Sequence, residues 1–112
     1  MVMQEVPPGS GPPLHHHEDS DEALYVVSGN FEFTLDREIR RLAAGGFLFI
    51  PRGVRHRFVN LGPGTSSLLV ISAPGGFEEY FRERVNINPA TDAAAIAELG
   101  SRFRMVVDAP EA

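Results

Sequence analysis

The segment from Gly9 to Gly29, GSGPPLHHHEDSDEALYVVSG, places two histidines and a glutamate at spacings that β-strands can bring to one point. Side chains alternate between the two faces of a strand, so His15 and His17 should point to the same side of a sheet. Glu22 begins a run rich in β-branched and aromatic residues, and a hairpin-turn signal closes that run. The segment therefore predicts strands that carry three polar groups on one face.

A second segment, from Gly45 to Asn60, adds a fourth polar group and reads GGFLFIPRGVRHRFVN. Its FLFI run is typical of a strand, and Pro51 should stop that strand because proline cannot donate to a ladder. Gly53 permits a tight reversal, after which His56 begins the next strand. Three imidazoles and one carboxylate suit iron, manganese, nickel, copper or zinc, and the chain has no cysteine to supply a thiolate. We therefore expect a mononuclear metal site.

Both segments resemble the two sequence motifs of the cupin superfamily, with every motif position filled. The tail from Pro74 onward is similar to that of small quercetin-dioxygenase-like cupins. The resemblance implies a mainly β fold, a barrel or jelly roll of antiparallel strands with one or two C-terminal α-helices. It implies one divalent transition metal per chain, with two coordination positions left for water, substrate or dioxygen. The implied ligands are His15, His17, Glu22 and His56, whereas His16 should point away.

One domain accounts for the whole chain, with residues 1–75 as the barrel core and residues 76–112 as a helical segment on the same domain. After Gly76 the apolar residues recur at helical spacing. This segment can lie over the barrel opening or pack outside it. In the first case its large apolar residues would line the pocket: Phe77, Tyr80, Phe81, Phe103 and Met105.

Large apolar residues of the barrel strands are candidates for its interior. They can fill the core or form a pocket for an aromatic or hydrophobic substrate, and a register error of one residue would reverse the face of any strand. The candidates are Leu24, Phe31, Phe33, Phe47, Phe49 and Phe58.

Three functions are compatible with these residues, because this fold hosts many unrelated activities. The first is a dioxygenase that acts on an aromatic or enolic substrate, with Glu22 as a catalytic base that can leave the metal and accept a proton. The second is a non-redox cyclase or isomerase, of polyketide or sugar type, in which the metal acts as a Lewis acid. The third is a small-molecule binding module without turnover.

Composition excludes other classes of function. The net charge of −5 argues against a nucleic-acid partner, whose binding would depend on phosphate neutralisation. No apolar run is long enough to cross a bilayer, and no signal peptide is visible, so we expect no membrane partner and a cytoplasmic location. The expected ligand is a small-molecule substrate.

Few residues precede the first motif, since only eight come before Gly9. Either the barrel is more open, or the start is truncated, or a neighbouring subunit completes the sheet. An open strand edge invites pairing with another chain. We therefore expect a homodimer in which the strand formed by residues 2–6 pairs across the interface.

Overall fold

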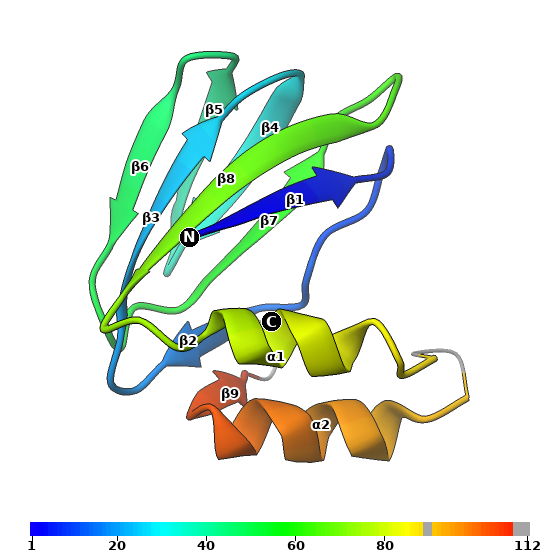
Figure 1. The fold of residues 1–112 in the computed structure, drawn as a ribbon. Coiled ribbons are helices and arrows are strands. Elements are labelled where there is room, and N and C mark those ends of the chain that lie inside the picture. Colours follow the sequence, from blue (N-terminus) through cyan, green and yellow to red (C-terminus); the bar gives the residue numbers. More distant parts are fainter. Residues whose placement is uncertain (89–90, 109–112) are drawn as a thin grey trace.

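Two antiparallel sheets lie face to face and enclose a hydrophobic core (Figure 1). The structure is a computed structural model that describes residues 1–88 and 91–108. The first sheet has the order β1 (Val2–Val6), β8 (Ser66–Ala73), β3 (Asp21–Val26), β6 (Phe47–Ile50). The second has the order β5 (Glu38–Ala43), β4 (Asn30–Leu35), β7 (His56–Asn60), β2 (His15–His17), β9 (Met105–Val107). This arrangement confirms the predicted mainly β jelly roll.

The core follows from alternation along the strands. In the strands that cross the interior, alternate residues are buried. Most of them are apolar and pack between the two inner faces, as in other β-sandwiches, and the polar exceptions are His15, His17, Glu22, His56, Asn60 and Ser66. Three phenylalanine rings meet at its centre, with centroids 5.8 to 6.1 Å apart. The buried apolar residues of the two sheets are Val6, Leu24, Val26, Phe31, Phe33, Leu48, Ile50, Phe58, Leu68 and Val70.

Strand β6 faces the opposite way from the sequence-based expectation. Its inner residues pair with the inner residues of β3, as in the partners Leu24 and Leu48. Phe47 and Phe49 therefore point outward, with 59% and 54% of their surface exposed. The prediction that these two phenylalanines line the interior was wrong, because a four-residue apolar strand has no polar alternation to fix its register. The other four pocket candidates lie in the core, as expected for one of their two roles.

Asn60, at the end of β7, is buried and ties three backbone segments together. Its side-chain amide donates to the carbonyls of Val6 and Gly64, both at 2.8 Å. Its side-chain oxygen accepts a hydrogen bond from the backbone N–H of Gly62, also at 2.8 Å. The side chain thereby satisfies backbone groups of a loop that has no ladder partner.

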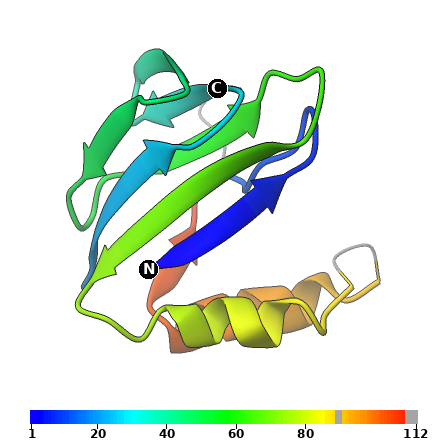
Figure 2. The same ribbon diagram turned by 45° about the horizontal axis from the view of Figure 1, so that its top comes forward.

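Two helices lie side by side beneath the barrel, α1 (Glu78–Arg84) and α2 (Ala93–Arg102) (Figures 1 and 2). The side chain of Asp92 begins α2, because it accepts a hydrogen bond from the N–H of Ala95 at 3.1 Å. After α2 the chain returns to the second sheet as β9, a strand that the sequence did not predict. In the described part of the chain, neither helix has the length and apolar character needed to cross a membrane.

Strand β1 pairs with β8 of the same chain, from Val2 with Val70 to Val6 with Ser66. It lies at one edge of the first sheet, and β6 lies at the other. In the described residues, the second edge of β1 has no strand partner, so pairing of that edge with another chain stays a prediction.

Candidate metal centre

Four polar side chains from three strands converge at the end of the barrel nearest the helices. His15 and His17 come from β2, Glu22 from β3 and His56 from β7, so both sheets contribute. None of the four is more than 7% exposed. Each histidine offers one nitrogen within 4.8 Å of the nitrogens from the other two. Since unpaired polar groups are rarely buried, such a cluster requires a common partner.

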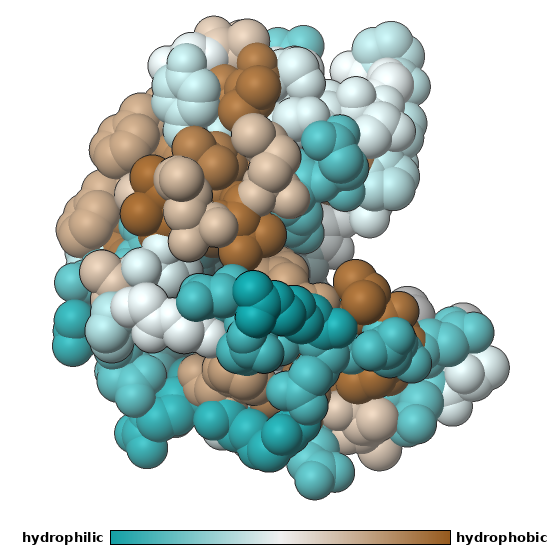
Figure 3. All heavy atoms as spheres, in the orientation of Figure 1, coloured by the Kyte–Doolittle hydropathy of each residue, from teal (hydrophilic) through white to brown (hydrophobic). Residues whose placement is uncertain are grey.

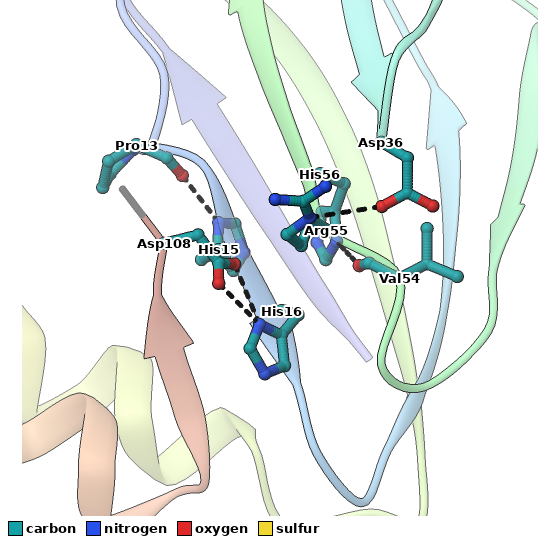
Figure 4. Close-up of polar contacts among 8 residues, drawn as sticks. All are labelled: Pro13, His15, His16, Asp36, Val54, Arg55, His56 and Asp108. Carbon is teal, nitrogen blue, oxygen red and sulfur yellow. Dashed lines mark hydrogen bonds and ion pairs between the residues drawn. The ribbon is translucent and has the colours of Figure 1, made fainter. Parts of the chain in front are cut away.

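Backbone carbonyls fix the orientation of two of the imidazoles. His15 donates its Nδ1–H to the carbonyl of Pro13 at 2.8 Å, and His56 donates its Nδ1–H to the carbonyl of Val54 at 2.9 Å (Figure 4). With the proton on Nδ1, the lone pair of each ring lies on Nε2. The Nε2 atom of His56 is buried and has no hydrogen-bond partner in the described residues. A carbonyl behind the ring and a free lone pair in front are typical of a metal ligand.

Glu22 lies beside two of the three histidines. Its Oε2 atom is 2.9 Å from His17 Nε2 and 3.8 Å from His56 Nε2. Two neighbouring ligands of an octahedral ion, each roughly 2.1 Å from the metal, are about 3 Å apart. The three histidines are therefore placed to hold a divalent metal, and Glu22 lies next to His17 at the edge of this group.

The protonation states also suit a metal. Burial, and then the nearby His56, lower the pKa of His15 from 6.5 to about 4. Burial likewise lowers the pKa of His56, although the Glu22 carboxylate opposes the shift. Burial alone would raise the pKa of Glu22, but the hydrogen bond with His17 and the neighbouring imidazoles outweigh it, so this pKa is lowered. At neutral pH these groups are neutral imidazoles and a carboxylate, the forms that bind metal.

The turn at Gly53 leads from β6 into β7 and also contacts β2. Its φ of +83° lies in the left-handed region that glycine adopts without strain. Its backbone N–H donates to the carbonyl of His17 at 2.7 Å. The turn predicted from the sequence therefore also holds β2 against the start of β7.

His16 points away from the centre, as predicted. Its Nδ1 atom lies 2.8 Å from the carboxylate of Asp108, which follows β9 (Figure 4). Strand β2 forms one residue pair with β7 but three with β9. The C-terminal segment therefore supplies most of the ladder that holds the ligand strand in place.

The helical segment reaches the centre through Phe77, which directly precedes α1. The ring of Phe77 packs edge-on against His17, with centroids 4.9 Å apart, and stacks on Tyr80 at the same distance. Phe103, after α2, completes this aromatic cluster at 5.9 Å from Phe77. The sequence left two placements open for the helical segment, over the barrel opening or outside the barrel. The structure thus favours the first.

The structure brings the three expected histidine ligands together, with Glu22 beside His17, whereas the sequence could not indicate the groups that support them. The carbonyls of Pro13 and Val54 carry no side-chain signal. Each lies two residues before the histidine that it orients. This two-residue offset is the one local feature that could have indicated them.

The fold is a jelly roll with a buried histidine triad that could hold a metal. The family model described as the cupin domain matches residues 2–72, so the chain belongs to the cupin family.

Curated relatives connect the chain with two kinds of chemistry. The polyketide synthase CurC of Streptomyces cyaneus is 42% identical over 62 residues, which cover 55% of this chain and 40% of that protein. The quercetin 2,3-dioxygenase of Bacillus subtilis is 40% identical over 50 residues, which cover 45% of this chain and 15% of the enzyme. The chain thus spans less than half the length of either relative.

Solved structures agree with the fold. The structure of KdgF from a Halomonas species has a TM-score of 0.62 and 30% sequence identity, and the match covers 69% of each chain.

Proposed function

We propose that this protein is a metal-dependent enzyme that acts on a small aromatic or enolic molecule. The observation that carries this proposal is the convergence of three buried imidazoles and a buried carboxylate, in which the Nε2 atom of His56 has no hydrogen-bond partner in the described residues. A divalent ion bound there would act as a Lewis acid toward a substrate oxygen, or as a redox centre for dioxygen. With four protein ligands, two positions of an octahedral shell stay open to substrate.

Glu22 is the group best placed to move a proton. Its carboxylate is ionised at neutral pH because its pKa is lowered, and only the oxygen Oε2 has ion pairs with the histidines. A phenol or enol that enters the open positions would come within reach of this carboxylate. Glu22 would then accept the hydroxyl proton as the substrate binds.

Phe77 and its neighbours would provide the surface for a flat substrate. The ring of Phe77 already covers His17, and Tyr80 extends the same aromatic cluster. Because the ligands are buried, a substrate would reach the metal by displacing Phe77. Aromatic rings stack on flat, electron-rich molecules with a gain of roughly 1 kcal/mol beyond burial. This preference favours phenolic or polyketide-like substrates over sugars.

Oxygen dependence separates the two chemistries. A dioxygenase is favoured by the similarity to quercetin 2,3-dioxygenase, whereas a Lewis-acid cyclase is favoured by the similarity to the polyketide synthase CurC. The dioxygenase is our first candidate, since an open metal beside an aromatic cluster suits a flavonol-like substrate. In the second candidate, a metal held by the histidines would supply Lewis-acid polarisation of a carbonyl, and ring closure would need no oxidant.

The test begins with metal content, measured by mass spectrometry on untagged protein prepared without nickel resin or chelator. The metal-loaded protein is then given flavonols, catechols and poly-β-ketones, with and without oxygen. Oxygen uptake that tracks flavonol or catechol loss supports the dioxygenase. Turnover of a poly-β-ketone under nitrogen supports the cyclase.

The variant Glu22→Gln tests the role of the carboxylate. It keeps the shape of the side chain but removes the base, so turnover should fall by about 100-fold or more. Metal-loaded protein that binds these substrates but turns over none of them, in either atmosphere, would contradict the enzyme proposal and leave a binding module.

A further inference from the structure

Strand β9 lies beside β2 and extends the inner face on which two of the histidines lie. In antiparallel strands, residues that face each other across the ladder point to the same side of the sheet. His15 faces Val107, and His17 faces Met105. Since His15 and His17 point into the barrel, Val107 and Met105 lie on the same side of the sheet as the candidate metal centre.

Exposure rises along one row of residues that crosses the second sheet. His56 on β7 faces His15 on β2, and His15 faces Val107 on β9. Their exposed fractions are 2%, 6% and 50%. Val106, which points to the opposite side of β9, is only 36% exposed. In a strand with one covered face the inward residue is the more buried one, so within the described part of the chain the inner face is left open beside His15.

The other side of the centre, next to His17, is covered by the helical segment. Phe77 packs against the ring of His17. Met105 lies against α2 at Gly100, where an added Cβ would come within 3.1 Å of the Met105 methyl group. Teal spheres predominate over the two helices in Figure 3, which is typical of a cover with one solvated face. The helices thus close the His17 side and leave the side at Val107 open.

The residues that make this cover and this opening lie outside the region that the family model matches. That match covers residues 2–72, which include all three histidines of the centre. Phe77, Met105 and Val107 follow it in the chain. Proteins that share a fold differ in function through the residues around the site. The C-terminal segment is therefore where this chain can set a substrate preference of its own.

We propose that Val107 forms the outer wall of the substrate site and limits the size of the ring system that binds beside the metal. This inference rests on the proposed function, because it takes a flat phenol or enol as the ligand. Such a molecule would replace the ring of Phe77 over His17, and its far end would extend along the inner face of β9.

The spacing of the strands gives this wall its place. Val107 lies one strand from His15, about 4.8 Å away, and diagonally across from His17, about 7 to 8 Å away. A molecule with a single ring fits within this distance of the histidines. A molecule with three rings has to pass over Val107.

Val106 provides the matched control, because it is the same residue type on the opposite face of β9. Val107→Trp and Val106→Trp add the same bulk, but only the first adds it beside His15. Neither valine is among the proposed ligands, so both variants should bind one zinc per chain with wild-type affinity. Metal analysis and titration with zinc check this before any organic ligand is added.

The experiment compares two ligands of the zinc-loaded protein by isothermal titration calorimetry. They are catechol, with one ring, and the flavonol quercetin, with three. Val107→Trp should weaken the binding of quercetin relative to catechol by about 10-fold or more, because the indole occupies space that the larger ligand needs. Val106→Trp should leave the ratio of the two dissociation constants unchanged. Val107→Ala, which removes bulk, should shift the ratio in the opposite direction.

Three outcomes would overturn the proposal. The first is a ratio that Val107→Trp leaves unchanged, or that Val106→Trp changes as much. The second is tighter binding of quercetin by Val107→Trp, since a larger side chain would then not limit size. The third is zinc-loaded wild-type protein that binds neither ligand. If Val107→Trp failed to fold, Val107→Ala would decide, because truncation at an exposed position costs little stability.

These outcomes separate the wall from the proposed function. Protein that binds both ligands, shows the expected shifts in their ratio and turns over no substrate contradicts the enzyme proposal and keeps the wall. Protein that turns over a substrate, but whose ratio is the same in wild type, Val107→Trp and Val107→Ala, keeps the enzyme and contradicts the wall.

Discussion

The interior of the barrel has two halves that share strands but differ in chemistry. On β7, His56 and Phe58 are two residues apart on the same inner face, and on β3 the same holds for Glu22 and Leu24. One half is a dry core of phenylalanines, and the other is a cluster of buried polar groups held by backbone carbonyls. Burial of the phenylalanines stabilises the fold, whereas burial of the polar groups costs their hydration. Coordination of a metal would compensate for that cost. Because side chains on one face of a strand recur every two residues, the polar centre lies next to the apolar core on the same strands.

The largest effect should come from the apolar half. Phe33→Ala removes a fully buried ring from the aromatic centre, so it should lower the free energy of unfolding by about 3 to 5 kcal/mol. Chemical denaturation of the metal-free protein measures this change. Phe49→Ala is the matched control, and at protein concentrations where the chain is monomeric it should cost less than about 1 kcal/mol because its ring is exposed. Equal losses in the two variants would contradict the division between core and surface.

The polar half should respond in metal affinity instead. His56→Ala removes one of four ligands, so affinity for a divalent metal should fall by about 100-fold or more. Isothermal titration with zinc and metal analysis of purified protein measure the loss. His16→Ala, on the outer side of the same sheet, should keep full metal stoichiometry. Full metal occupancy in His56→Ala would show that the ligand set is wrong.

Acid should destabilise the metal-free protein through the polar half. The pKa of His15 is about 4 in the folded chain and near 6.5 when unfolded, so between these values the unfolded state binds more protons. Stability should therefore fall as pH falls from about 6.5 to about 4, by up to roughly 1.4 kcal/mol per pH unit for this residue. Denaturation in the presence of a chelator at several pH values tests the slope. His15→Gln should flatten it, and an unchanged slope would contradict the assignment.

The smallest effect should come from the contact between His16 and Asp108 on the outer face of β2. Asp108→Asn replaces a charge-assisted contact to His16 with a neutral one, so it should lower stability by about 1 kcal/mol. Because this contact supports β2, metal affinity should fall only a few-fold. Titration calorimetry and thermal unfolding measure both. If Asp108→Asn lost as much metal affinity as His56→Ala, the contact between His16 and Asp108 would be part of the metal site, which contradicts its position on the outer face of β2.

Much of this division could be predicted from the sequence, because polar and apolar residues alternate where strands are half buried. The spacing of His15 and His17, and the inward run that follows Glu22, needed no tertiary information. The prediction of the inward face of β6 was wrong because all four of its residues are apolar, so either face fits the alternating pattern. The register of β6 is set by its pairing with β3, which joins residues far apart in the chain.

Two neighbours of the candidate metal centre, Phe77 and β9, could not be predicted from the sequence for another reason. Phe77 contacts His17 only because the helices fold back beneath the barrel, and a helical pattern does not encode the direction in which a helix is placed. Strand β9 has three residues, too few for alternation to distinguish it from a loop. Its place beside β2 follows from the sheet, which offers an open ladder that the chain can fill.

The pairing of β2 with β9 has a consequence for the time at which the metal can be acquired. At a synthesis rate of roughly 5 to 20 residues per second, residues 105–107 follow His56, the last of the expected ligands, by on the order of two to ten seconds. During that interval all four ligands have been made, but β2 lacks the neighbour with which it forms three of its four residue pairs. The nascent chain therefore carries an incomplete chelator. A metal that needs a fixed β2 would therefore bind after β9 has joined the sheet.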